Sequence, residues 1–167
     1  MSSPQSPSSN SKYSSLYNPP QFTSTDWGLA CTLLQEHALA SLVSVSEDGL
    51  PLITHLPLHT TAQSTADEWR LLGHMANANP HCQLLHNNTQ AVVTVMGPQA
   101  YMSPSVYPDL QRVPTWNYVA LHANVSVRVL SAAEQKDVLL KQLIADHEPS
   151  YAQQWRDLPE QYTQAML

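Results

Sequence analysis

Residues 115–130 read TWNYVALHANVSVRVL, and their pattern decides the class of fold. From Val119 to Val129 an apolar side chain stands at every second position, with polar or small side chains mostly between. Successive side chains of a strand point to opposite faces of a sheet. The alternation therefore predicts one long strand over 115–130, with a core face and a wetter face.

The segment 39–58 predicts a β-hairpin. A β-rich run over 39–45 is followed by Glu47-Asp48-Gly49 and by a second run over 50–58. Asp-Gly is a favoured two-residue hairpin turn. Further strands are expected at 68–76, 91–96 and 99–102, with Gly97-Pro98 ending the strand at 91–96, and loops at 60–67 and 103–114.

Helices are expected around these strands. Asp26 offers N-cap chemistry for a helix over 26–37, and Asn79 followed by Pro80 predicts a short helix over 80–85. Ser131-Ala132-Ala133-Glu134 has the form of a capping box, and the helix that it begins is expected to end near His147. A last helix is expected over 158–167.

About six strands with short helices indicate a mainly β fold with flanking helices, arranged as a small mixed barrel. Regular βαβ alternation is absent, which argues against a doubly wound sheet. Residues 1–15 are rich in Ser, Pro and Asn and are expected to form a disordered tail. Residues 16–167 are expected to form one domain.

The charge of the chain argues against direct nucleic-acid binding. The net charge is −6, and the seven Lys and Arg residues are scattered along the sequence. A DNA-binding protein neutralises several phosphates with clustered cations. The sequence also lacks an apolar run long enough to span a membrane and a signal core near Met1, so a cytoplasmic protein is expected. Cys31 and Cys82 are expected to be buried free thiols.

Four motifs occur in an order that resembles a known family. They are His55-Leu56-Pro57-Leu58, Gly73-His74-Met75-Ala76-Asn77-Ala78-Asn79-Pro80, Gly97-Pro98-Gln99-Ala100-Tyr101-Met102-Ser103-Pro104-Ser105 and Val113-Pro114-Thr115-Trp116-Asn117-Tyr118. Together they resemble the PaiB-like FMN-binding negative transcriptional regulators. The resemblance covers residues 16–167 and implies an FMN-binding split β-barrel, a homodimer, and FMN near the subunit interface.

Three features depart from that family's pattern. Asn77 stands where Arg is usual, and Val106 stands where Trp is usual. The family also continues past a Met-Leu like Met166-Leu167 into a terminal strand, so a barrel incomplete at its C-terminus is expected. An Asn donates only a neutral hydrogen bond, and weaker FMN binding is expected from the change at Asn77.

The phosphate of FMN is expected at the junction of 74–81. The start of a helix at Pro80 would present free N–H groups and a positive dipole end, and small side chains let the backbone come close. His74 or His81 would add charge when protonated. The cofactor residues expected here are His74, Met75, Ala76, Asn77 and Asn79. A strand that ends in a capped helix, without a ligand, is the competing interpretation.

The isoalloxazine ring is expected against the third and fourth motifs. Polar side chains would bond the ring edge and aromatic ones would form the walls; the candidates are Tyr101, Ser103, Thr115, Trp116, Asn117 and Tyr118. Without the resemblance, core aromatics and turn residues would be the simpler interpretation. His55 is also a candidate, although a histidine that ends a strand is more often a hydrogen-bonded structural residue.

Other chemistry has less support in the sequence. His81, Cys82 and His86 fit one helix face poorly, so no metal site is expected. Ser103 and Ser105 lack the context of a catalytic nucleophile, and no catalytic residues are predicted. A FMN-binding protein with a regulatory role is therefore the favoured function. A flavin reductase-like enzyme using NAD(P)H, a cofactor-free barrel, and a haem-binding barrel with His122 as ligand are the alternatives.

Overall fold

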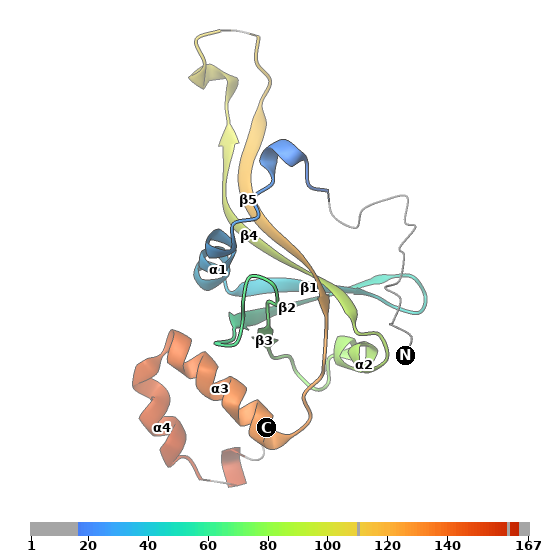
Figure 1. Cartoon of the computed structure of the whole chain (residues 1–167), viewed down its shortest axis with the longest axis vertical. Coiled ribbons are helices and arrows are strands. Elements are labelled where there is room, and N and C mark those ends of the chain that lie inside the picture. Colours follow the sequence, from blue (N-terminus) through green and yellow to red (C-terminus); the bar gives the residue numbers. More distant parts are fainter. Residues whose placement is uncertain (1–16, 110, 160, 164–167) are drawn as a thin grey trace, which may run out of the picture.

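The computed structural model describes residues 17–109, 111–159 and 161–163. Its centre is an open five-stranded sheet in the order β3-β2-β1-β4-β5, and every neighbouring pair is antiparallel. The strands are β1 (Leu39–Val45), β2 (Pro51–Thr60), β3 (Leu71–Gly73), β4 (Gln90–Met102) and β5 (Thr115–Ser126) (Figure 1). The prediction of a mainly β fold with flanking helices is confirmed at this level, and parallel βαβ units are absent from the described sheet.

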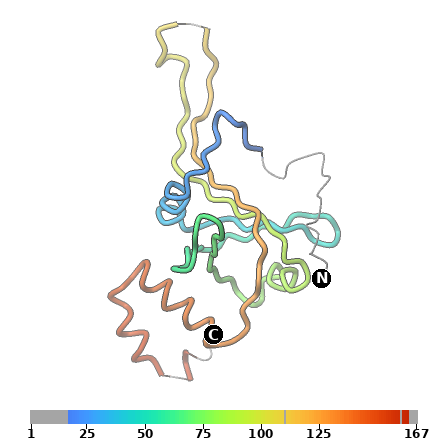
Figure 2. Tube along the Cα trace, viewed as in Figure 1, coloured from blue at the N-terminus to red at the C-terminus, as the bar shows by residue number. Residues whose placement is uncertain are grey.

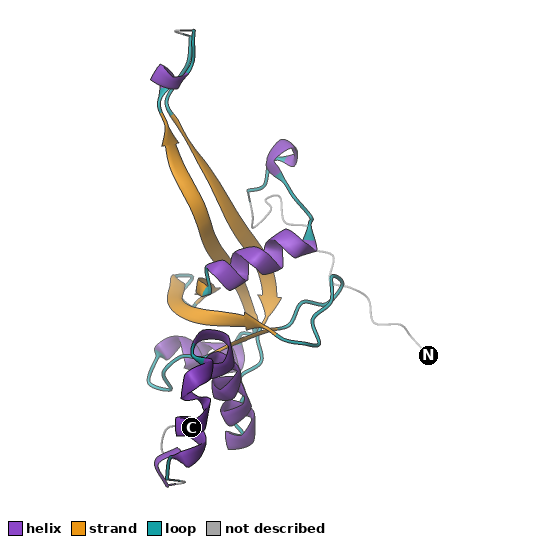
Figure 3. Ribbon diagram, turned by 90° about the vertical axis from the view of Figure 1, so that its left-hand side faces the viewer, coloured by secondary structure: helices purple, strands orange, loops and turns teal. Residues whose placement is uncertain are grey.

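Helices flank the sheet. They are α1 (Trp27–Glu36), α2 (Pro80–Asn87), α3 (Ala133–His147) and α4 (Ala152–Asp157), with short 3₁₀ turns at Pro20–Phe22, Pro104–Val106 and Pro149–Tyr151 (Figure 3). The predicted caps of the first two helices are confirmed. Asp26 Oδ1 accepts a hydrogen bond from Leu29 N, and Asn79 Oδ1 accepts one from His81 N.

The hairpin predicted from Asp48-Gly49 is confirmed. Gly49 has a φ of +78°, which glycine adopts without steric cost. Gly49 N donates to Ser46 O, and Ser46 N donates to Leu50 O, which closes the turn between β1 and β2. The register pairs Val43 with Ile53 and Ser41 with His55.

The predicted end of a strand at Gly97-Pro98 is wrong, because β4 runs through both residues. The ladder between β4 and β5 shifts register between Met96 and Gln99, which is a β-bulge. A bulge accommodates Pro98, which has no N–H for the ladder. Gly97 packs closely against α1, since a Cβ there would lie 2.4 Å from Leu33 Cδ1 and the Leu33 side chain would have to move.

Two other strands are shorter than predicted. Of residues 68–76 only Leu71–Gly73 pair as a strand, because the Ser64 side chain binds both the N–H and the carbonyl of Arg70. The long strand ends at Ser126 and not at residue 130. Val127 N already donates to Thr89 O, just before the first residue of β4, so the ladder has no further partner strand there.

The C-terminal part differs most from the sequence prediction. The capping box at Ser131 does not form, since α3 has Ala132 as its N-cap and no side-chain cap hydrogen bond. Helix α4 was not predicted. The helix predicted over 158–167 lies partly outside the described residues, which show a helical turn at 161–163. The predicted tail at 1–15 also lies outside them.

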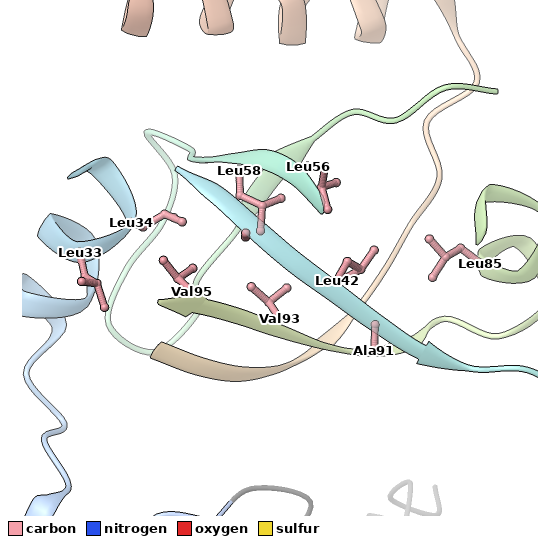
Figure 4. Packing of buried hydrophobic residues seen from close by; sticks show 10 residues of the cluster. Leu33, Leu34, Leu42, Leu56, Leu58, Leu85, Ala91, Val93 and Val95 are labelled. Atoms are coloured by element: carbon pink, nitrogen blue, oxygen red, sulfur yellow. The ribbon is translucent and has the colours of Figure 1, made fainter. Parts of the chain in front are cut away.

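The core lies between one face of the sheet and the helices α1 and α2. Its buried members are Leu33, Leu34, Ala40, Leu42, Leu56, Leu58, Leu85, Ala91, Val93 and Val95 (Figure 4). Alternate residues of β1 and β4 supply this inner face. The opposite face, called the outer face below, carries Ser41, Ile53, His55, Thr94 and His122.

One part of the sheet extends beyond this core. Residues 99–102 of β4 and 115–118 of β5 form a two-stranded arm that projects well away from the rest of the chain (Figure 2). The described residues 103–109 and 111–114 lie between these two strands, at the tip of the arm.

Candidate functional site

The loop before α2 is built on a closed set of hydrogen bonds. Asn79 Nδ2 donates to Thr54 Oγ1 at 3.1 Å, and Thr54 Oγ1 lies 2.9 Å from His81 Nδ1. Asn79 Oδ1 also accepts from His81 N at 3.0 Å. These contacts attach the beginning of α2 to strand β2. The loop over 74–78 is therefore held at its C-terminal end.

The first turn of α2 offers fewer free donors than the sequence suggested. His81 N bonds the Asn79 side chain, Cys82 N donates to Asn79 O, and Pro80 has no N–H. By contrast, the backbone N–H groups of Ala76, Asn77 and Ala78 make no hydrogen bond within the described residues, and all three residues are exposed. The donors available to an anion therefore lie in the loop.

The two histidines of this region favour their neutral forms. His74 is exposed, yet desolvation and then the nearby His59 lower the pKa of its imidazole. His81 is only 1% exposed, and burial lowers its pKa. Its Nε2 has no hydrogen-bond partner in the described part of the chain. Neither side chain therefore supplies a positive charge near pH 7 unless an anion binds beside it.

The residues predicted to hold the ring lie on the arm and divide between its two faces. Tyr101 is paired with Trp116, and Gln99 with Tyr118, so the three aromatic side chains share one face. The Tyr101 and Trp116 rings meet edge to face, with centroids 6.0 Å apart. Thr115 and Asn117 lie opposite Met102 and Ala100 on the other face. Ser103 ends the arm, where its Oγ accepts from Ser105 N.

The aromatic face of the arm is open. Tyr101, Trp116 and Tyr118 are 55%, 58% and 60% exposed. Exposed apolar side chains are common, but contiguous groups of aromatic ones mark interaction sites. We call these three residues the aromatic strip.

His55 lies in the middle of strand β2 on the outer face. The prediction that His55 ends a strand is therefore wrong. Its Nδ1 is 2.9 Å from Ser41 Oγ, which is the structural hydrogen bond expected as the alternative to cofactor binding. Strand register places Ser41 beside Thr94, and Thr94 beside His122. A row of polar side chains thus crosses the outer face from β2 to β5.

The predicted cofactor residues therefore occupy three separate places: the loop over 74–79, the outer face at His55, and the arm. The arm projects away from the body of the fold, whereas the loop that leads into α2 lies beside the body of the sheet, away from the arm (Figure 1). One copy of the chain does not bring them together around a single ligand.

One contact in the structure has no signal in the sequence. His59 Nδ1 lies 2.7 Å from Asp146 Oδ2 and joins β2 to the end of α3. His59 is buried and its Nε2 has no partner within the described residues. The two residues are 87 positions apart, so spacing could not have revealed the pair.

No described group of three or more His, Cys, Asp or Glu residues has the geometry to hold a metal ion. Cys31 and Cys82 are free thiols, as predicted, but they are half-buried and not buried. Burial raises the pKa of the Cys31 thiol. None of the described helices has the length and apolar character needed to cross a membrane.

Comparison with known proteins identifies the class. The family described as "Putative FMN-binding domain" matches residues 16–167, and the chain belongs to this family. The PaiB-like resemblance carried by the four motifs is thereby confirmed.

Two relatives are similar over parts of their length. The "Protease synthase and sporulation protein PAI 2" of Bacillus subtilis is 33% identical over 128 residues, which are 77% of this chain and 58% of that protein. The "Uncharacterized protein YKL070W" of Saccharomyces cerevisiae is 29% identical over 80 residues, 46% of each chain. The chain thus spans about half the length of the curated relatives that it matches.

Proposed function

We propose that this protein is a cytoplasmic, PaiB-like regulator that binds FMN as a homodimer, with a split-barrel domain over 16–167. Membership of the FMN-binding family supports the cofactor. The observation that carries the dimer is the distance between the loop at 74–79 and the arm. If both contribute to one FMN site, the arm of one copy must meet the loop of another.

In this arrangement the free N–H groups of Ala76, Asn77 and Ala78 bind the phosphate, and the aromatic strip of the partner borders the ring. FMN supplies redox or light-absorbing chemistry when bound. The scattered cations support regulation without direct DNA contact by this chain.

Titration with FMN, followed by the quenching of flavin fluorescence, tests the site. An Asn77→Arg variant should bind FMN about tenfold more tightly, because Arg adds a charged, bidentate donor beside the phosphate. Asn87→Arg adds the same charge at the far end of α2 and should leave the affinity unchanged. Absence of saturable binding in every variant would exclude FMN as a ligand.

Sedimentation tests the dimer independently of the cofactor. A mass of twice 18.5 kDa is expected, whereas a mass of one chain at high concentration would contradict the shared site. Oxidation of NADH by the FMN-loaded protein would favour the reductase alternative over a regulatory role.

A further inference from the structure

A cavity lies between the two C-terminal helices, away from every residue assigned to FMN. Its volume is about 300 Å³, at the small end of the range for ligand pockets. Lys141 and Ile144 line it from α3, and Ala152, Trp155 and Arg156 line it from α4. Residues three or four positions apart share one face of a helix, so one face of each helix is turned to the cavity.

The lining combines apolar walls with two positive charges. Ile144, Ala152 and Trp155 are half-buried, whereas Lys141 and Arg156 are exposed. The whole sequence has only seven Lys and Arg residues, and two of them meet here. No carboxylate is among the described lining residues. The charged side chains that line the cavity are thus both positive, although the chain as a whole has a net charge of −6.

Asp137 orients two of the side chains that line this cavity, Trp155 and Lys141. Its Oδ1 accepts a hydrogen bond from Trp155 Nε1 at 3.4 Å, and its Oδ2 accepts one from Lys141 Nζ at 2.5 Å. Asp137 therefore balances the charge of Lys141. Arg156 bonds the neutral amide oxygen of Gln153 at 2.7 Å, and forms no ion pair with a described carboxylate. One positive charge is thus left for a ligand.

We propose that this cavity binds a small organic monoanion, a carboxylate attached to a flat or branched apolar body. The apolar body would lie against Trp155, Ile144 and Ala152, and the carboxylate would accept hydrogen bonds from Arg156. A guanidinium favours a carboxylate over a point anion because its planar donors match two oxygens. Such a site would be separate from the residues assigned to the flavin.

Calorimetric titration with 2-naphthoate, and with the neutral 2-naphthylmethanol, tests the proposal. Naphthoate should saturate, and the alcohol should bind about fivefold more weakly, since one charge interaction at an exposed site is lost. Arg156→Gln should remove this difference. Arg112→Gln, which removes an exposed arginine from the loop at the arm's tip, should preserve it.

A cavity-filling variant, Ala152→Phe, should abolish naphthoate binding while FMN binding stays unchanged. If that variant fails to fold, Arg156→Gln still decides, because it replaces an exposed side chain. Equal affinity for acid and alcohol, or no saturable binding of naphthoate, would overturn the proposal. Competition between FMN and naphthoate would also overturn it, because the two ligands would then share a site.

Discussion

Strands β4 and β5 contain two regions that pair in the same way but differ in their surroundings. Near Val93 and Val95, strand β4 belongs to the central sheet. Both side chains are buried in the core, together with residues of β1, β2 and α1. Beyond the bulge the same two strands carry the aromatic strip, which is open to solvent in the described structure. Burial of apolar surface explains the first region, whereas none of the described residues covers the aromatic strip in the second. The arm is therefore the part of the described structure that best fits a binding surface for another molecule.

The largest loss of stability is expected on the packed side. Leu34→Ala should lower the free energy of unfolding by about 3 kcal/mol, because it leaves a cavity at a side chain that is only 1% exposed. Urea denaturation measures this change. Gln35→Ala, at an exposed position of the same helix, is the control and should have little effect. If Leu34→Ala lowered the free energy of unfolding as little as Gln35→Ala, α1 would not be packed on the sheet.

A loss of about 1–2 kcal/mol is expected from Asn79→Ala, because the variant removes both the cap of α2 and the bond to Thr54. Asn79→Asp keeps the cap acceptor but not the donor, so its free energy of unfolding should lie between those of the unchanged protein and Asn79→Ala. Asn87→Ala, at the other end of α2, is the matched control. If all three variants unfold at the same urea concentration, the closed hydrogen-bond set does not contribute to stability.

A smaller effect is expected from pH. Burial lowers the pKa of His81 in the folded chain, so the unfolded chain takes up a proton at a higher pH than the folded chain does. Stability is then fully present above about pH 6.5 and is lost as pH falls toward the folded pKa. Urea midpoints between pH 7 and 5 measure this slope. His81→Gln should reduce this slope and leave the part that His74 contributes, whereas His86→Gln, an exposed position of α2, should not change it.

The smallest change in stability is expected on the arm. Trp116→Ala should alter the free energy of unfolding by no more than about 0.5 kcal/mol when it is measured at a protein concentration low enough to dissociate the proposed dimer. The same variant should lower the sedimentation mass at high concentration, because the aromatic strip is proposed to meet a second copy. Val113→Ala, an exposed apolar position in the tip loop, should leave the mass unchanged. A large loss of stability in dilute Trp116→Ala would place the strip against its own chain.

The parts of the fold that sequence predicted are those decided by local chemistry. Asp48-Gly49 specified the hairpin, Asn79-Pro80 specified the start of α2, and the alternation over 119–126 specified strand β5. The continuation of β4 through Gly97 was missed because it depends on the bulged pairing with β5, a strand that lies elsewhere in the sequence. The His59–Asp146 contact was missed for the same reason.

The sequence predicted which residues could form the candidate site, but not how those residues are arranged in space. The motifs correctly marked Asn79 as a cap, because that prediction needs only neighbours in sequence. Trp116 and Tyr118 share a face of the arm, but their role at a flavin ring stays a prediction. Sequence order does not state whether the arm meets the loop of its own chain or that of another copy. The pairing of Lys141 with Arg156 at one cavity likewise depends on how α3 and α4 pack, which no local pattern records.

The bulge between Met96 and Gln99 has a consequence for the aromatic strip. Before it, the even-numbered residues of β4, such as Thr94 and Met96, face the same side as His122. After it, the odd-numbered Gln99 and Tyr101 do so, opposite Tyr118 and Trp116. One inserted residue thus exchanges the parity of the whole distal strand. Without it, Tyr101 would point away from Trp116, and the arm would carry aromatic side chains on both sides instead of one shared surface.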